Sequence, residues 1–285
     1  MTSFFADLGD NPFLIHGLWA GLLASIACGV MGPFVVARRI VFLAGAIAHI
    51  AVGGVGAAIY LQYRYPDSLS GLSPIYGATV VSILAAVILA VLHTRVREQL
   101  DTIVGALWAL GMAVGLLLVK ITPGYQTELM SYLFGNLVFV GPEGLRLMIF
   151  LDVIIVATVL LFYKRFFAIC LDAEQAILQG VPLLATEIIL LVLVALTVIV
   201  LTQVVGLILV IALLSLPAAT AGHLVSRLPA LIWLSISLCV FLTTVPRIAV
   251  YSTSISPEPA IVLAAASLYI VAILIQRRVA GASRA

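Results

Sequence analysis

The sequence predicts an all-α protein: a polytopic bundle of membrane-spanning helices in which residues 1–285 form a single transmembrane domain. Of the 285 residues, 64% are hydrophobic and 9% are charged, whereas soluble domains carry about 25% charged residues. The apolar runs have the length of about 20 residues that a helix needs to cross a bilayer, too long for the strands of a β-barrel. The formal net charge of +2 gives no indication of nucleic-acid binding.

Short polar segments divide the chain into about nine predicted membrane spans, within a range of eight to ten. The link at 203–205 is so short that the sixth and seventh spans are expected to form a tight hairpin. The segment 131–141 is apolar but only half a span long. It is either an interfacial or re-entrant piece or part of a longer, tilted fifth helix. The predicted spans are 14–36, 41–62, 74–93, 102–120, 145–163, 184–202, 206–221, 229–247 and 259–276.

Positively charged residues orient these spans, because cytoplasmic loops carry an excess of Lys and Arg. With the N-terminus outside, the 14 basic residues divide into ten inside and four outside. The predicted location is the plasma membrane, with the C-terminus in the cytoplasm. The inner set is Arg38, Arg39, Arg95, Arg97, Lys164, Arg165, Arg227, Arg277, Arg278 and Arg284; the outer set is Arg64, Lys120, Arg146 and Arg247.

The polar stretch LDAEQAILQGVP, residues 171–182, predicts a short helix on the cytoplasmic side. Asp172 is an N-cap residue, and Gln175 three positions later completes a capping box. Gly180 supplies a C-terminal stop, and Pro182 prevents continuation. A helix of about two turns is not stable alone in water. We therefore interpret this stretch as a docking point for a soluble partner.

The sequence lacks the motifs of the common catalytic sites, so we expect no enzyme activity and assign no catalytic residue. It contains no GxxxxGK[ST] phosphate-binding loop, no HExxH, no CxxC pair and no GxSxG. ATP must therefore be bound by a separate subunit if the protein uses it. We interpret the three cysteines, Cys28, Cys170 and Cys239, as small apolar helix residues.

Ionisable residues inside spans are functional candidates by default. His49, in the second span, either binds a cation or bonds to the backbone of a neighbouring helix. We predict that Asp101 caps a helix and that Asp152 faces the outer water. For Glu187, near the inner end of the sixth span, both a structural and a functional role remain open.

Small residues and one proline are the other candidates within the spans. Glycines allow close helix packing, and Pro217 is expected to kink its helix, either as a hinge or as a fixed bend. The packing candidates are Gly53, Gly54, Gly111 and Gly115.

Six stretches taken together resemble the permease subunits of the ABC-3 family, which import zinc, manganese or iron. They occur in the family's order and cover nearly the whole chain. They are GVMGPFVVARRIVFL (29–43), AIAHIAVGGVG (46–56), LDTIVGALWALGMAVG (100–115), MSYLFGNL (130–137), LDAEQAILQG (171–180) and VVGLILVIALLSLPAATA (204–221).

The resemblance implies a type II ABC importer-like permease whose cargo is a divalent transition metal ion and which holds no tightly bound cofactor. Its implied partners are ATP-binding ATPase subunits, a second permease copy or paralogous permease, and an extracytoplasmic metal-binding protein. His49 would line the pathway. The coupling residues would be Asp172, Glu174, Gln175, Ala176 and Gly180.

The chain departs from the family pattern at Gly45, where the family usually has an Asp one turn before the histidine. A pathway site would then need other donors, such as Glu128, Tyr125 or Asp67. Glu258 also stands where the family commonly has glycine. Three alternatives remain: an ABC importer of a non-metal substrate, an ATP-independent secondary transporter, and a membrane assembly factor that transports nothing.

Overall fold

The computed structural model describes residues 12–69, 71, 73–96, 100–123, 141–251, 253 and 257–282, and every regular element in these ranges is an α-helix. Eight helices of this described part are long and apolar enough to cross a membrane, which agrees with the predicted all-α bundle. The apolar segment of half a span predicted at 131–141 falls outside the described residues, except for residue 141. The helices are α2 (Pro12–Ala37), α3 (Val41–Arg64), α4 (Pro66–Leu69), α5 (Pro74–Arg95), α6 (Leu100–Ile121), α8 (Pro142–Leu171), α9 (Ala173–Leu178), α10 (Leu183–Leu224), α11 (Leu228–Val250) and α12 (Pro257–Ala282).

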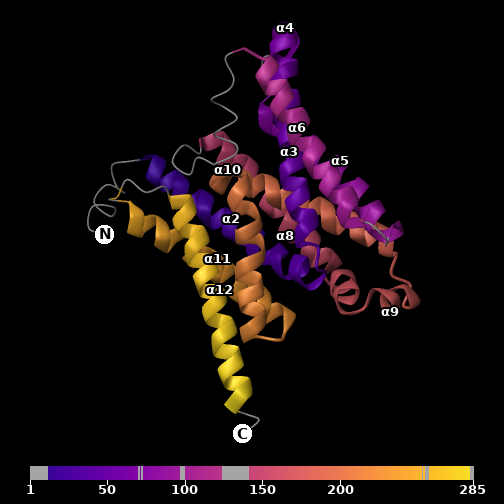
Figure 1. The fold of residues 1–285 in the computed structure, drawn as a ribbon, viewed down its shortest axis with the longest axis vertical. Coiled ribbons are helices and arrows are strands. Elements are labelled where there is room, and N and C mark those ends of the chain that lie inside the picture. Colours follow the sequence, from indigo (N-terminus) through magenta and orange to yellow (C-terminus); the bar gives the residue numbers. More distant parts are fainter. Residues whose placement is uncertain are drawn as a thin grey trace.

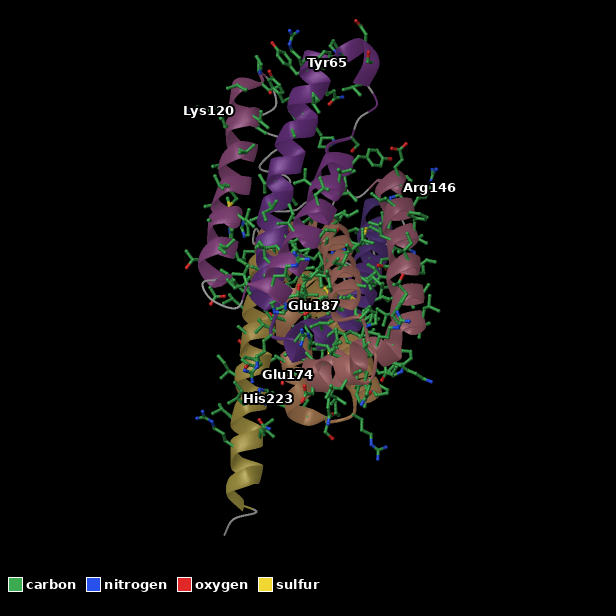
Figure 2. The ribbon with its side chains drawn as sticks, turned by 90° about the vertical axis from the view of Figure 1, so that its right-hand side faces the viewer. Tyr65, Lys120, Arg146, Glu174, Glu187 and His223 are labelled. Carbon is green, nitrogen blue, oxygen red and sulfur yellow. The ribbon has the colours of Figure 1, made fainter. Side chains whose placement is uncertain are left out.

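Helix α10 contains the predicted sixth and seventh spans, joined by one non-helical residue. Gly206 has φ 68° and ψ 172°, a backbone conformation open almost only to glycine. The two arms of α10 diverge from this point (Figure 1). Glu187, near the start of α10, and His223, near its end, both lie away from the end of the bundle where Tyr65 lies (Figure 2). The second arm includes an apolar helix of only 16 residues. The chain thus turns back at one glycine.

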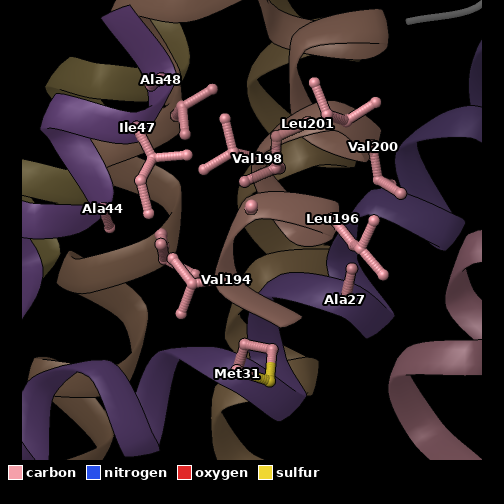
Figure 3. Packing of buried hydrophobic residues seen from close by; sticks show 14 of the residues in the cluster. Ala27, Met31, Ala44, Ile47, Ala48, Val194, Leu196, Val198, Val200 and Leu201 are labelled. Carbon is pink, nitrogen blue, oxygen red and sulfur yellow. The ribbon is translucent and has the colours of Figure 1, made fainter. Parts of the chain in front are cut away.

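The core lies where α2, α3 and the first arm of α10 meet. Figure 3 shows Ala44 and Ile47 of α3 beside Val194 of α10, and Ala27 of α2 beside Leu196. These five residues are at most 7% exposed. Helices α5 and α6 pack on α3, whereas α8 and α11 pack on α2. Helix α10, which contacts α2, α3, α5 and α8, is therefore the central element that joins the two groups of helices.

Glycines bring the backbones of α3, α5 and α6 into contact. A Cβ added to Gly56 would lie 2.5 Å from the carbonyl oxygen of Gly115, and one added to Gly53 would lie 3.0 Å from that of Gly111. A Cβ added to Gly54 would lie even closer to the carbonyl oxygen of Gly77 on α5. Such approaches are possible only between small residues.

We predict that Gly56→Leu destabilises the bundle by about 1–3 kcal/mol or more, because the new side chain must push apart two backbones. The control is Gly105→Leu on α6, where an added Cβ meets nothing within 4 Å. The measurement is the thermal midpoint of the detergent-solubilised protein. Equal midpoints for the two variants would contradict the packing described here.

Pro217 lies in the second arm of α10, where the helical dihedrals continue through it. Proline has no N–H to give to the carbonyl four residues earlier, which here belongs to Leu213. The thiol of Cys239 on α11 lies 3.8 Å from that oxygen and donates to it. A cysteine that the sequence suggested to be merely apolar thus satisfies the carbonyl that the proline leaves free.

The prediction that Asp152 faces the outer water is wrong. Helix α8 begins at Pro142, so Asp152 lies about 15 Å along it, and its side chain is buried at 5% exposure. Neither carboxylate oxygen has a hydrogen-bond partner within the described ranges. Asp101, predicted to cap a helix, is exposed and lies within the first turn of α6, one residue after Leu100.

Two residues assigned to the outer side by loop charge lie toward the opposite end of the bundle from the predicted cytoplasmic helix. Figure 2 places Lys120 and Arg146, with Tyr65, toward one end, and Glu174, with His223, toward the other. Helix α8 connects the two ends and, with 30 residues, is about 45 Å long. It therefore extends past the predicted span end at 163 and carries Lys164 and Arg165 within it, rather than in a loop.

Candidate functional site

The short helix predicted at 171–182 exists as α9, and its two ends are fixed by specific hydrogen bonds. Oδ1 of Asp172 accepts from the backbone N–H groups of Glu174 at 2.8 Å and Gln175 at 3.2 Å. At the other end Gly180, with φ 82°, donates to Ile177, and the next residue, Val181, donates to the carbonyl of Ala176. These two bonds form a Schellman motif.

The capping-box interpretation of Gln175 is not what the structure has. The backbone N–H of Asp172 donates to the carbonyl of Ala168, which closes the last turn of α8. That N–H is thus already satisfied and the return bond of a capping box is not needed. Asp172 is at once the C-cap of α8 and the N-cap of α9.

One side of α9 holds it to the protein and the other faces away. Ala176 is buried at 2% exposure, whereas Leu178 is 85% exposed and Ile177 is 49% exposed. Glu174 and Gln175 are exposed as well. Apolar residues exposed together on a short helix outside the spans indicate an interaction surface. Figure 1 shows α9 at the edge of the bundle.

A charged cluster lies beside α9 that sequence reasoning did not identify. The guanidinium of Arg38, after α2, pairs with Oε1 of Glu187 on α10 and donates to the carbonyl of Ile169 on α8 at 3.1 Å. Nδ1 of His93 on α5 lies 2.9 Å from the same carboxylate oxygen. The Glu187 side chain is fully buried. Ala173 of α9 lines a pocket of about 300 Å³ together with Arg38, His93 and Glu187.

The cluster therefore joins the ends of α2, α5, α8 and α10 at the base of α9. The sequence placed Arg38 only as one of many basic inner residues and left Glu187 open between two roles. The pairing depends on which helices meet, and neither hydropathy nor charge count contains that information.

His49 lies away from α9, at the interface of α3 and α6. Its ring stacks on that of Trp108, with centroids 4.4 Å apart and planes 19° apart, and its Nδ1 lies 3.1 Å from Sδ of Met112. Gly45, one turn earlier on α3, faces Ile211 of the second arm of α10. Sequence reasoning missed Trp108 and Met112, although their spacing of four residues puts both on one face of α6.

The remaining predicted residues are distributed through the bundle. Gly53, Gly54, Gly111 and Gly115 belong to the helix contacts described above, and Asp67 lies in α4. Glu128 and Tyr125 fall outside the described residues. Within the described part, no group of three or more His, Cys, Asp and Glu side chains is arranged to hold a metal ion.

Comparison with known proteins places this geometry in a family. A family model described as the ABC 3 transport family matches residues 10–276. A probable metal transport system membrane protein of Chlamydia trachomatis is 33% identical over 93% of this chain and 90% of its own length. The manganese transport system membrane protein MntC of Listeria monocytogenes is 28% identical over 95% and 93%, respectively.

A solved structure has the same arrangement of helices. PsaBC from Streptococcus pneumoniae, in complex with Fab, matches 95% of this chain and 94% of its own with a TM-score of 0.83 and 27% identity. ATP hydrolysis in such transporters belongs to separate subunits, so the chain is not itself an enzyme. By sequence and by fold, the chain belongs to the ABC 3 transport family, as a membrane permease subunit of the metal-transporting ABC type.

Proposed function

We propose that this permease imports a divalent transition metal ion, zinc, manganese or iron, driven by partner ATPases that dock on α9. It would lie in the plasma membrane with its N-terminus outside and work beside a second copy or a paralogous permease. An extracytoplasmic metal-binding protein would deliver the ion. The observation that carries the docking proposal is the outward face of α9, where Leu178 is 85% exposed on a helix fixed at both ends.

The residues of α9 have two roles: some hold the helix in place, and others would contact the ATPase. Asp172 and Gly180 hold the helix ends, and Ala176 seats the helix on the bundle. Glu174 and Gln175 would meet the ATPase together with the exposed apolar residues. A helix presented in this way can enter a groove with little loss of conformational entropy on binding.

Movement of α9 would reach the transport helices through the charged cluster. Arg38 contacts both α8 and α10, the two helices on either side of α9. ATP-driven closure of the ATPases would shift α9 and, through this cluster, α10, which packs on α2, α3 and α5. Pro217 is a candidate hinge in the second arm. Access to the pathway would then alternate between the two sides, as in other transporters.

The ion would pass His49 on its way from the outer loops to the positively charged inner face. We expect His49→Ala to lower ATP-dependent metal accumulation by about tenfold or more, because it removes the imidazole donor from the α3–α6 interface. His16→Ala on α2 is the matched control, and membrane-inserted protein is quantified for both. Accumulation of zinc, manganese and iron is measured in cells that lack other importers. Unaltered levels with His49→Ala would contradict a role for this residue in transport.

The ATP-independent secondary transporter is the second candidate. It predicts that accumulation persists when the partner ATPase carries an inactive ATP site. The ABC importer predicts complete loss in the same experiment, so the two functions are distinguished without any change to the permease.

A further inference from the structure

The structure brings a soft donor to the histidine that the sequence singled out. Nδ1 of His49 on α3 and Sδ of Met112 on α6 are 3.1 Å apart. Trp108, one turn before Met112, stacks on the opposite helix's imidazole at 4.4 Å. The two helices are in extensive contact, so all three side chains lie at the interface between α3 and α6.

The spacing of the two donor atoms is close to that needed for a shared metal ion. Bonds of about 2.0 Å to an imidazole nitrogen and about 2.3 Å to sulfur, meeting at the tetrahedral angle that zinc prefers, put the two donor atoms about 3.5 Å apart, so the pair at 3.1 Å would have to separate slightly to admit the ion. The same distance is compatible with an N–H···S hydrogen bond, and the experiment below separates the two.

The donors present, and the one missing, determine the class of ion. Thioether sulfur favours soft cations, and imidazole suits zinc and copper, whereas manganese prefers carboxylate and carbonyl oxygens. Gly45, the residue one turn before His49, offers no side-chain oxygen, and the space that its Cβ would enter is occupied by Cδ1 of Ile211 at 2.9 Å. The buried carboxylate of Glu187 is paired with Arg38 and His93 elsewhere.

We propose that His49 and Met112 form a two-donor transit site for a soft or borderline cation, of the zinc or copper(I) class, that discriminates against manganese. This inference rests on the proposed import function and goes further by naming a ligand and a selectivity. Two protein donors leave the ion with open positions, so it can be passed on rather than trapped. This proposed selectivity for zinc or copper(I) differs from the manganese transport stated in the name of the Listeria monocytogenes relative.

The first test removes the sulfur and retains the side-chain volume. Full-length permease with its ATPase is expressed in cells deleted for other importers, and ATP-dependent uptake is measured separately for Zn²⁺, ascorbate-reduced copper and Mn²⁺. Met112→Leu is expected to lower the uptake of zinc, of copper or of both by about tenfold relative to manganese. The matched control, Met148→Leu in the buried core of α8, should keep the wild-type ratios.

The second test adds a hard donor. Gly45→Asp places a carboxylate one turn from His49 and should raise manganese uptake relative to zinc and copper by about tenfold. Gly45→Ala is the control for the steric effect of adding a Cβ at this position, which would push aside the terminal methyl group of Ile211. X-ray absorption of the purified complex loaded with zinc or copper(I) should show a sulfur neighbour at about 2.3 Å that Met112→Leu removes.

The outcomes separate this inference from the function on which it rests. Wild-type selectivity for manganese, or unchanged ion ratios and an unchanged sulfur signal in Met112→Leu, would overturn the His49–Met112 site and leave a hydrogen bond, while import itself would stand. Failure of the wild-type complex to move any of these ions, or iron measured in the same assay, with ATP would overturn the proposed function together with the site.

Discussion

Glu174→Arg is expected to abolish ATP-driven uptake while the permease remains folded and inserted. The side chain is exposed on α9, a helix of six residues, so docking would depend on very few contacts. In such interfaces a few residues carry most of the binding energy, and a reversed charge costs several kcal/mol when it meets a complementary surface. We expect co-purification of the ATPase to fall by more than about tenfold, since each 1.4 kcal/mol is a factor of ten.

Glu143→Arg is the matched control for this change. Glu143 is also an exposed carboxylate, on the first turn of α8, at the opposite end of that helix from α9. It should leave ATPase co-purification unchanged. Leu178→Asp is an independent variant, because a side chain that is 85% exposed contributes little to the permease fold. If both α9 variants retained the ATPase and full uptake, α9 would not be the docking helix.

Glu187→Ala is expected to cost about 3–5 kcal/mol of stability, because it leaves the Arg38 guanidinium without its carboxylate in a largely buried position. The two side chains are 0% and 15% exposed, so solvent screens the pair only weakly. The measurement is the thermal midpoint of the purified permease in detergent, with Glu143→Ala as an exposed control. A midpoint equal to that of wild type would show that the pair contributes nothing to the fold.

A double variant separates the role of this pair in stability from its role in transport. Replacing both partners, Arg38→Met with Glu187→Leu, removes the uncompensated charge and should recover most of the lost stability. If the cluster transmits the movement of α9, uptake should remain low in the double variant despite the recovered fold. Recovery of both stability and uptake would make the cluster a structural feature only.

The positions of the helices could be predicted from sequence because the bilayer fixes the length of each span. Each of the nine predicted spans falls within the bounds of a helix, and the link at 203–205 lies next to the turn at Gly206. The ends of α9 were also predictable, because Asp172 and Gly180 satisfy local backbone groups. Rules of this kind involve neighbours in the sequence and require no knowledge of the tertiary structure.

The contacts between helices could not be predicted, because lipid and protein interior are similarly apolar. Helix α3 is 83% buried and α6 only 17% over their apolar windows, yet both qualify as spans by composition. The pairing of Arg38 with Glu187, the burial of Asp152 and the approach of Met112 to His49 all depend on that missing information. The sequence could nominate His49 but not the side chain that meets it.

The joint at Asp172 limits how a force on α9 can travel. Because this one residue ends α8 and begins α9, the connection has a single pair of backbone dihedrals and no slack. A longer loop would absorb a small displacement by bending, whereas here α9 must either pivot on one residue or move the end of α8. Since α8 is about 45 Å long, a small rotation at this joint becomes a much larger displacement at its far end.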